Sequence, residues 1–342
     1  MRKRAAFSAA ALVLCALSLV GCGSFVRSLP KVSLPPLTTA APAALCAPSP
    51  GLVSACRRLG DLTTLDPCSL VSLGQLPADL AASPLPRESL DYCAFRITAG
   101  ADKAAEVEVG QLEAADDAGA RRYDAGSTQL QPAGLDLEQG SVSGGACYDA
   151  VQFQGDVVDL QINVFAMQGE GDQALCDAAN EVGKAVGVVL NGKTQMQHFT
   201  VPRNSIAKLH ACGLANDARI GSYTLDDQPE TPSGHYCIWQ PDTSDYTVEF
   251  GISLEIGSDA LQQGADSHTK IHGLDTYTIK YDDTDDAQCE VDTYRIPWGT
   301  TGSGLHEIAS IWTIEPAGQI DAACTAATQI ATVVWPKLPP LK

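Results

Sequence analysis

The chain has 342 residues, of which 45% are hydrophobic, and its 41 acidic and 22 basic residues give a formal net charge of −19. An acid surplus of this size argues against binding to nucleic acid, because phosphate recognition needs a basic surface. It favours solubility and does not by itself specify a partner.

The first 21 residues have the pattern of a secretory signal peptide. Arg2, Lys3 and Arg4 precede an apolar stretch from residue 5 to residue 20, slightly shorter than the about 20 residues of a spanning helix. The sequence LVGC at 19–22 resembles the bacterial lipobox, whose cysteine receives a diacylglyceryl group. We therefore expect Cys22 to anchor the chain at the outer face of the cell membrane through its lipid. The alternative is an ordinary signal peptide with a chance cysteine.

Residues 22–60 are rich in Pro, Ala, Ser and Leu, which predicts a stalk between the lipid and the folded part. Ten cysteines follow Cys22, and an even number in an exported chain predicts disulfides. These candidates are Cys46, Cys56, Cys68, Cys93, Cys147, Cys176, Cys212, Cys237, Cys289 and Cys324. We expect the first two, which flank APSPGLVSA, to pair with each other.

The last eight cysteines form two sets of four with similar spacing. The first gap is 25 residues in both sets, the second is 54 against 52, and the third is 29 against 35. DYCAF at 91–95 matches HYCIW at 235–239, and the segments that start at Cys176 and Cys324 share C-x-A-A. The sequence therefore predicts a tandem duplication. Its parts are module one at 61–192, a linker at 193–206 and module two at 207–342.

Module one begins with LDPCSLV at 65–71, which predicts a short helix with Asp66 as N-cap and Pro67 at the first helical position. The alternation in YCAFRI at 92–97 and in VVDLQINVF at 157–165 predicts half-buried strands. A helical period then follows, with apolar residues on one face and Asp172 as the expected cap. Those apolar residues are Leu175, Ala178, Ala179, Val182, Val186 and Val189.

Module two repeats this order. YTVEFGISLEI at 246–256 alternates as a strand, and ACTAATQIATVVW at 323–335 is a helix that Pro336 ends. Each module is therefore expected to be α+β, with a disulfide-stapled antiparallel sheet packed by an opening and a closing helix.

Four cysteines in a module allow three pairings. We favour Cys68–Cys93 with Cys147–Cys176, and Cys212–Cys237 with Cys289–Cys324. The first bridge of each module would tie the opening helix to its strand, and the second would tie the closing helix to the sheet. Each would stabilise the fold by about 2–4 kcal/mol.

Two segments match nucleotide-binding expressions but stand in the wrong context. GVVLNGKT at 187–194 fits the P-loop pattern, yet it lies at the end of a predicted helix, where carbonyl groups point outward. GEGDQA at 169–174 imitates a dinucleotide fingerprint, but Glu170 and Asp172 would repel a pyrophosphate. We predict no cofactor.

The metal-site candidates are equally weak. YDDTDDAQCE contains a possible Ca²⁺ group, Asp282, Asp283, Asp285 and Asp286, but no glycine stands at the turn position of an EF-hand loop. His268 and His272 are four residues apart, as in a helical zinc pair, but their segment has the pattern of a strand or turn. We favour a solvated acidic loop and no metal, and we predict no catalytic residue, since no G-x-S-x-G elbow occurs.

The lipobox, the Pro-rich stalk, DPCSL at 66–70, YCAF at 92–95 and the CDAA helix at 176 resemble the actinobacterial lipoproteins of domain of unknown function 3558. A more distant resemblance is to the disulfide-bonded extracellular sensor domain of a mycobacterial Ser/Thr kinase. The likeness covers residues 60–192 and is weaker in the second copy, which has LHACGL in place of LDPCSL. The resemblance implies an exported, anchored α+β domain for binding or sensing. The family has no established catalytic residues that could be assigned to positions of this sequence.

We therefore expect a non-enzymatic, lipid-anchored cell-envelope protein with tandem sensor-like modules that bind a ligand or a partner. Its partners would be the membrane, through the lipid on Cys22, and an unknown envelope protein or small ligand, but no nucleic acid. The alternatives are an extracytoplasmic hydrolase without a recognisable motif and a purely structural envelope lipoprotein.

Overall fold

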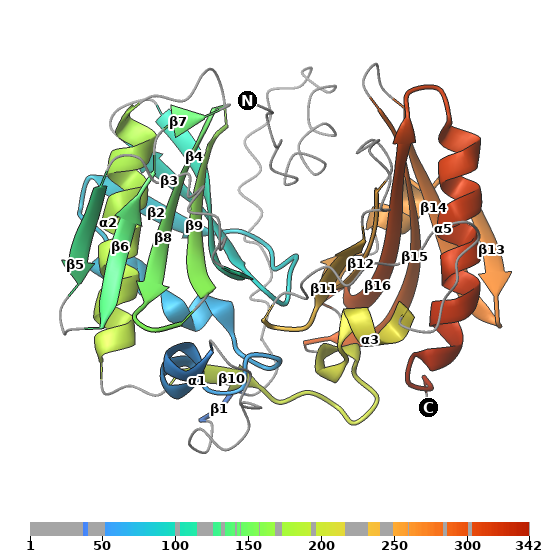
Figure 1. Ribbon diagram of the computed structural model, residues 1–342, viewed down its shortest axis with the longest axis horizontal. Helices are drawn as coiled ribbons and strands as arrows, with labels where there is room; N and C mark the ends of the chain where they lie inside the picture. Colours follow the sequence, from blue (N-terminus) through green and yellow to red (C-terminus); the bar gives the residue numbers. More distant parts are fainter. Residues whose placement is uncertain are drawn as a thin grey trace. The chain divides into compact units, whose positions relative to one another are not determined.

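The computed structural model describes residues 37–39, 52–99, 103–114, 126–130, 134–140, 142–143, 145–156, 158–167, 173–192, 196–215, 232–239, 249–258, 260–282, 286–299 and 303–341. Over these residues the chain is mixed α and β, with two large antiparallel sheets and few helices (Figure 1).

The first sheet has the strand order β2-β3-β4-β9-β8-β6-β5, and β7 pairs with β8 beside this path. All its pairings are antiparallel. Its strands are β2 (Leu80–Pro84), β3 (Cys93–Ala99), β4 (Lys103–Ala114), β5 (Gly126–Leu130), β6 (Leu135–Gln139), β7 (Val142–Ser143), β8 (Ala146–Phe153) and β9 (Val158–Ala166).

The helix α2 (Gln173–Asn191) packs on one face of the first sheet, against β6, β8 and β9 (Figure 1). Because strand side chains alternate between faces, the apolar positions of β3, β4 and β9 all point toward α2. Phe95, Val107 and Ile162 are fully buried there, and Val182 and Val186 of α2 pack in the same core. The helix predicted from the apolar period is thus present, although Asp172, its expected cap, lies outside the described residues.

The second sheet has the order β11-β12-β16-β15-β14-β13, also antiparallel throughout. Its strands are β11 (Tyr236–Trp239), β12 (Glu249–Ser258), β13 (Ser267–Ile271), β14 (Leu274–Asp282), β15 (Asp286–Trp298) and β16 (Leu305–Pro316), with the short helix α4 (Ala260–Gln263) after β12. The helix α5 (Ile320–Val334) packs against β14, β15 and β16, and the short 3-10 helix η4 (Trp335–Lys337) follows at Pro336. Ile252, Val291 and Ile330 are fully buried between sheet and helix.

Short helices precede the first strand of each sheet. Before β3 these are α1 (Val53–Leu59) and the 3-10 helices η1 (Pro67–Leu70) and η2 (Leu73–Gln75), and before β11 they are η3 (Ile206–Lys208) and α3 (Ala211–Ala215). The short helix expected after Asp66 is present as the 3-10 helix η1. Asp66 does cap it, since its Oδ1 accepts a hydrogen bond of 3.0 Å from the Cys68 N–H.

The segment assigned to the stalk contributes to the first core. Ala55 and Leu59 of α1 are fully buried. The helix has no capping side chain of its own, but Asp156 accepts hydrogen bonds from the Ser54 and Ala55 N–H groups. Residues 53–59 therefore belong to the folded body, because their first turn is fixed by a carboxylate about a hundred residues further along the chain.

The predicted linker also contains ordered structure. The strand β10 (Gln197–Phe199) pairs with β1 (Leu37–Thr39), and Leu65 forms a bridge with His198. The Asp66 N–H donates to the Gln197 carbonyl at 2.9 Å. This stretch is therefore tied to the start of module one and is not a free connection.

Four disulfides join described cysteines: Cys68–Cys93, Cys147–Cys176, Cys212–Cys237 and Cys289–Cys324. These are the four pairs that we favoured among the three pairings open in each module. They tie η1 to β3, β8 to α2, α3 to β11 and β15 to α5. Cys56 is also disulfide-bonded, while Cys46, its expected partner, lies outside the described residues. Within the described part of the chain, no helix is both long and apolar enough to span a bilayer.

Candidate functional site

The metal candidates from the sequence are only partly described. Asp282 ends β14 and Asp286 begins β15, while Asp283 and Asp285 lie outside the described residues. His268 lies on β13, where its Nε2 is 2.9 Å from Asp275 Oδ1, and His272 is in the following turn. No group of His, Cys, Asp and Glu suited to a metal ion exists among the described residues.

The two nucleotide-like motifs are partly described, and the described part of the first lies at the end of a helix, as predicted. Gly187 lies inside α2 and Asn191 ends that helix, so GVVLNGKT does not open a helix toward a phosphate. Residues 193–194 of that motif, 169–172 of GEGDQA and Cys22 lie outside the described residues.

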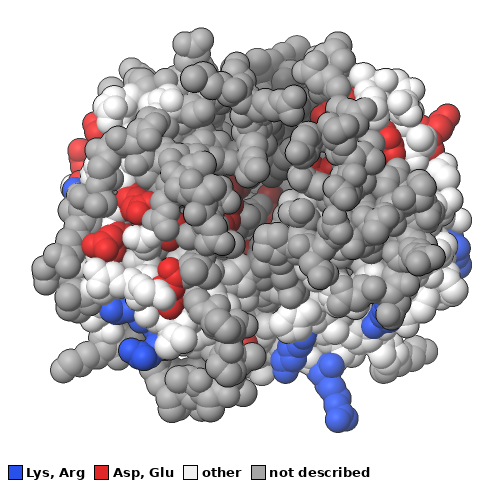
Figure 2. Space-filling model, viewed as in Figure 1, with Lys and Arg blue, Asp and Glu red and all other residues white. Residues whose placement is uncertain are grey.

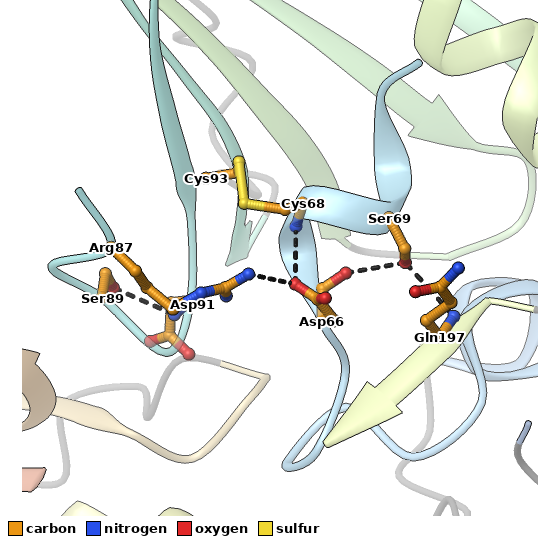
Figure 3. Close-up of polar contacts among 8 residues, drawn as sticks. All are labelled: Asp66, Cys68, Ser69, Arg87, Ser89, Asp91, Cys93 and Gln197. Atoms are coloured by element: carbon orange, nitrogen blue, oxygen red, sulfur yellow. Dashed lines mark hydrogen bonds and ion pairs between the residues drawn. A yellow bond between two sulfur atoms is a disulfide. The ribbon is translucent and has the colours of Figure 1, made fainter. Parts of the chain in front are cut away.

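A buried ion pair ties the start of module one to the loop before β3. Arg87 Nη2 lies 2.6 Å from Asp66 Oδ1, and the two side chains are only 5% and 3% exposed. The Arg87 guanidinium also lies 4.7 Å from the centre of the Phe199 ring. Figure 3 shows Ser69 between Asp66 and Gln197, donating to the Asp66 carbonyl at 2.7 Å and accepting from the Gln197 N–H at 3.2 Å. The cluster thus joins η1, the loop before β3 and β10.

A second contact connects that loop to module two. Asp91 Oδ1 is hydrogen-bonded to Nδ1 of His235, whose Nε2 faces the Ala207 carbonyl at 2.9 Å. A carbonyl oxygen only accepts, so Nε2 carries a proton and a further proton lies between Nδ1 and Asp91. Burial lowers the pKa of His235, but Asp91 and the carbonyl groups around it raise the pKa by more. The fold therefore stabilises the protonated form of His235 more than an ordinary histidine environment would.

The buried His–Asp pair is not arranged as a nucleophile-activating pair. In a catalytic triad Nε2 faces the nucleophile hydroxyl, whereas here it donates to a backbone carbonyl. The buried hydroxyl of Ser205 donates instead to Glu307, which also accepts from the Ile206 N–H at 2.9 Å. These groups hold the junction together, and among them the Ser205 hydroxyl is not placed against the His235 ring.

The face of the second sheet opposite α5 carries an unusual group of carboxyls. Glu290 and Asp292 are two residues apart on β15 and so share a face, and Ser310 lies opposite Asp292 on β16. Ser310 donates its one proton to Glu290 Oε1 at 3.0 Å. Asp292 is 1% exposed and lies within hydrogen-bonding range of Ser310 and Glu290. Burial, followed by the charge of Glu290, raises its pKa well above the ordinary range.

Further carboxyls extend this group toward the first sheet. Burial raises the pKa of Glu255, on β12, to about 7, and Glu290, Asp91 and Glu88 add to the rise. Burial likewise raises the pKa of Glu108, on β4, to about 7, with Glu106 adding to it. We call Glu108, Glu255, Glu290 and Asp292 the acidic cluster.

Tyr92 links the two parts of the acidic cluster. Burial raises the pKa of its hydroxyl far above the ordinary value, and the charges of both Glu108 and Glu255 contribute to that rise. Both carboxyls therefore lie within electrostatic range of one phenol. Asn163, opposite Glu108 on β9, is 7% exposed, and its Oδ1 has no hydrogen-bond partner.

Aromatic rings border the acidic cluster on the second sheet. Trp312 lies opposite Glu290 in the register and covers Gly251 of β12, where a Cβ atom would lie 2.4 Å from its Cζ2. The ring of Tyr236 stacks on Trp312 at 6.3 Å between centres. The same face therefore carries acidic side chains beside the flat aromatic surface of Trp312 and Tyr236.

Acidic and basic side chains are unevenly distributed over the face seen in Figure 2. Figure 2 shows Asp and Glu side chains in the upper and central parts of the view, and Lys and Arg mostly along its lower margin. A recess lined by Leu62, Leu65, Leu90, Asp91 and Leu112 has a volume of about 10 Å³, room for about one water molecule. It is too small for an organic ligand, so the acidic cluster is the stronger candidate.

Sequence reasoning missed the acidic cluster. The signal was available in EVEVG at 106–110, SLEIG at 253–257 and CEVDTY at 289–294, where acids alternate with apolar residues along a strand. Such acids normally face solvent, so the pattern alone does not predict that they are buried together.

No family model, curated protein or solved structure matches the chain. The functional assignment therefore depends on the residues themselves.

Proposed function

We propose that this chain is a non-enzymatic, lipid-anchored protein of the cell envelope that binds a ligand or a partner at the acidic cluster. The observation that supports the binding part is Asp292, a carboxyl that is 1% exposed and on which Glu290, Glu255 and Ser310 act but no Lys or Arg. Burying carboxyls together costs free energy unless something compensates for it. A bound molecule would supply that compensation.

The envelope part of the proposal rests on the lipobox at Cys22 and is supported by the disulfides. Bonds of this kind persist in oxidising compartments and are rare in the cytosol. The resemblance to the domain of unknown function 3558 lipoproteins and to a kinase sensor domain points the same way.

The proposed architecture is a tandem duplication. The order β3-β4-β9-β8-β6-β5 in the first sheet corresponds, strand for strand, to β11-β12-β16-β15-β14-β13 in the second. In each sheet the third strand of this order leads into the closing helix, and the disulfides join equivalent elements. Two unrelated domains would have no reason to share both the strand order and the bridge positions, so these observations support the duplication.

Anchoring is tested by replacing Cys22 with alanine and following the protein between membrane and soluble fractions. We expect Cys22→Ala to release the protein from the membrane, whereas Cys15→Ala, within the expected signal, should leave it anchored. Retention of the Cys22→Ala variant in the membrane fraction would show that lipidation at this residue is not the anchor.

Binding is tested by native mass spectrometry of the protein recovered from an exporting host. We expect an additional mass that disappears on denaturation. If only the bare chain is seen and crosslinking in the envelope captures no partner either, the binding proposal fails and a purely structural role is favoured.

A further inference from the structure

We propose that one end of the folded body is a basic surface that docks on the anionic phospholipid headgroups of the membrane. The proposal rests on the anchoring proposed at Cys22 and adds a second contact between the protein and the bilayer. The surface is formed by cations of α1, of the stretch after β10, of η3 and of η4: Arg57, Arg58, Arg203, Lys208 and Lys337. We call these five residues the basic end.

The charges of the chain are segregated along the sequence. All 41 acidic residues lie in two stretches, 61–181 and 217–321, and none lies in 22–60, 182–216 or 322–342. The three acid-free stretches contain ten Lys and Arg residues, whereas the two acidic stretches contain nine. A chain with a net charge of −19 therefore has three segments whose own charge is positive.

Contacts between backbone and side chains hold the first two acid-free stretches together. Arg58 Nη1 donates to the Leu190 carbonyl, near the end of α2, at 3.4 Å. The Leu59 carbonyl, at the end of α1, acts on the ring of His198 in β10. The last turn of α1 therefore lies at the same end of the fold as the chain that leaves β10 toward Arg203.

The third acid-free stretch is tied to the second. The carbonyl groups of Thr63 and Ala207 both act on the His235 ring, so η3 lies beside the loop that follows α1. Lys337 of η4 donates to the Leu214 carbonyl of α3 at 2.7 Å. The fold thus gathers cations that are far apart in the sequence.

The cations of the basic end are available to an anionic partner. Arg57, Arg203 and Lys208 are exposed, and no carboxylate among the described residues pairs with them. The described acids of the adjoining loops are instead occupied within the fold: Asp66 by Arg87, Asp61 by Thr63, and Asp156 by the N–H groups of Ser54 and Ala55.

Exposed apolar side chains accompany these cations. The exposed large apolar residues of the described part of the chain are Val53, Val188 and Leu341, at 54%, 53% and 48%, and one lies in each acid-free stretch. Cations beside exposed apolar side chains are typical of surfaces that lie at a bilayer interface, where the charges contact headgroups and the apolar groups enter the acyl boundary. A soluble anionic polymer offers nothing to the apolar side chains, so lipid fits these segments better.

The anchored part of the chain meets the fold at this end. β1 pairs with β10, with Leu37 opposite Phe199, and the 15 residues from Cys22 to Leu37 span at most about 50 Å. Attraction between a cation and an anionic membrane falls off within a Debye length, about 10 Å at 0.1 M salt. A few cations bind weakly on their own, so the contact orients the anchored protein and does not replace the lipid.

The test is co-sedimentation of the Cys22→Ala protein, which has no acyl chain at residue 22, with phospholipid vesicles at 0.1 M NaCl. We expect binding to vesicles of equal parts phosphatidylglycerol and phosphatidylcholine, binding weaker by about tenfold or more to phosphatidylcholine alone, and release at 0.5 M NaCl. Equal binding to the two kinds of vesicle, or binding that salt does not weaken, would overturn the proposal. Tighter binding to alginate, a soluble anionic polymer, would overturn it in favour of a polymer of the envelope.

Two double variants of equal net charge connect binding to the basic end. Arg203→Glu with Lys208→Glu reverses two exposed cations and should weaken binding to the anionic vesicles by about tenfold or more. Arg96→Glu with Lys280→Glu reverses two exposed cations of the sheets and should weaken it by less than about twofold. If the first double variant does not fold, Arg57→Glu with Lys208→Glu gives the same comparison.

The outcomes separate docking from anchoring. A Cys22→Ala protein that leaves the membrane in cells but does not bind anionic vesicles would overturn docking and leave the anchoring standing. Equal losses in the two double variants would assign the effect to net charge and so overturn the basic end. If Cys22→Ala stays in the membrane fraction until a wash with 0.5 M NaCl, the lipid is not the anchor and docking is supported.

Discussion

Replacing Arg87 with methionine removes one partner of the buried pair and keeps most of the apolar volume. Removing one member of a buried ion pair typically costs about 3–5 kcal/mol, because the other charge is left uncompensated. Here Asp66 keeps its hydrogen bond from the Cys68 N–H, but the contact between Arg87 and the Phe199 ring is lost as well. Since two nitrogens of Arg87 already lack partners, we expect the lower end, about 3 kcal/mol.

The measurement is urea unfolding at pH 7 with the disulfides intact, followed by far-UV circular dichroism. The four tryptophans all lie after residue 238, so their fluorescence reports separately on the second sheet. Lys184→Met, which removes an exposed pair with Glu181, is the control and should cost about 0.5 kcal/mol or less. The double variant Asp66→Asn with Arg87→Met should recover part of the loss, since asparagine still caps η1. A cost for Arg87→Met no larger than that of the control would refute the reasoning.

Three further predictions concern the second sheet and its junction. The folded state raises the pKa of His235, so its contribution to stability is complete below about pH 6.5 and is lost as the pH rises through the folded pKa. The stability lost on replacing it, His235→Gln, should therefore shrink between pH 6 and pH 9 in urea titrations. A difference that stays constant over this range would contradict the argument. Gly251→Ala places a Cβ against the Trp312 ring and should cost about 1–3 kcal/mol and shift the tryptophan emission, whereas Gly74→Ala, with open space around it, should do neither. Glu255→Gln should stabilise the ligand-free protein at pH 8 by about 2 kcal/mol, because the pKa of Glu255 is raised to about 7. Below pH 4.5 the same replacement should have little effect on stability. Equal effects at both pH values would show that the fold does not raise this pKa.

The elements that the sequence predicted well are those whose pattern is local. The alternation in YCAFRI placed Phe95 and Ile97 on one face, and both are buried in the first core. The helical period predicted α2 and α5, and the pairing of Cys289 with Cys324, favoured among three open possibilities, is present. Periodicity and capping depend on neighbouring residues, so one sequence is enough to read them.

The features that the sequence did not predict depend on residues far apart in the chain. The seven residues of α1 contain no cap, and the Asp156 carboxylate that fixes the first turn follows about a hundred residues later. The acidic cluster needs strands from both sheets, and Tyr92 comes within range of Glu108 and Glu255 only in the fold. Alternation tells which acids share a face, but it does not tell whether that face meets water.

The side chains on the two faces of the second sheet have opposite effects on the stability of the fold. The face toward α5 carries the Cys289–Cys324 bridge and apolar side chains such as Val291 and Ile330, which stabilise the fold. The opposite face carries Glu290 and Asp292, whose raised pKa values show that the fold disfavours their charge. An amide or apolar residue there would make the ligand-free protein more stable, so the carboxyls are accounted for by something other than folding. If binding of a ligand or partner is that reason, a single replacement should raise stability and weaken binding together, a combination that a purely structural role for these acids does not produce.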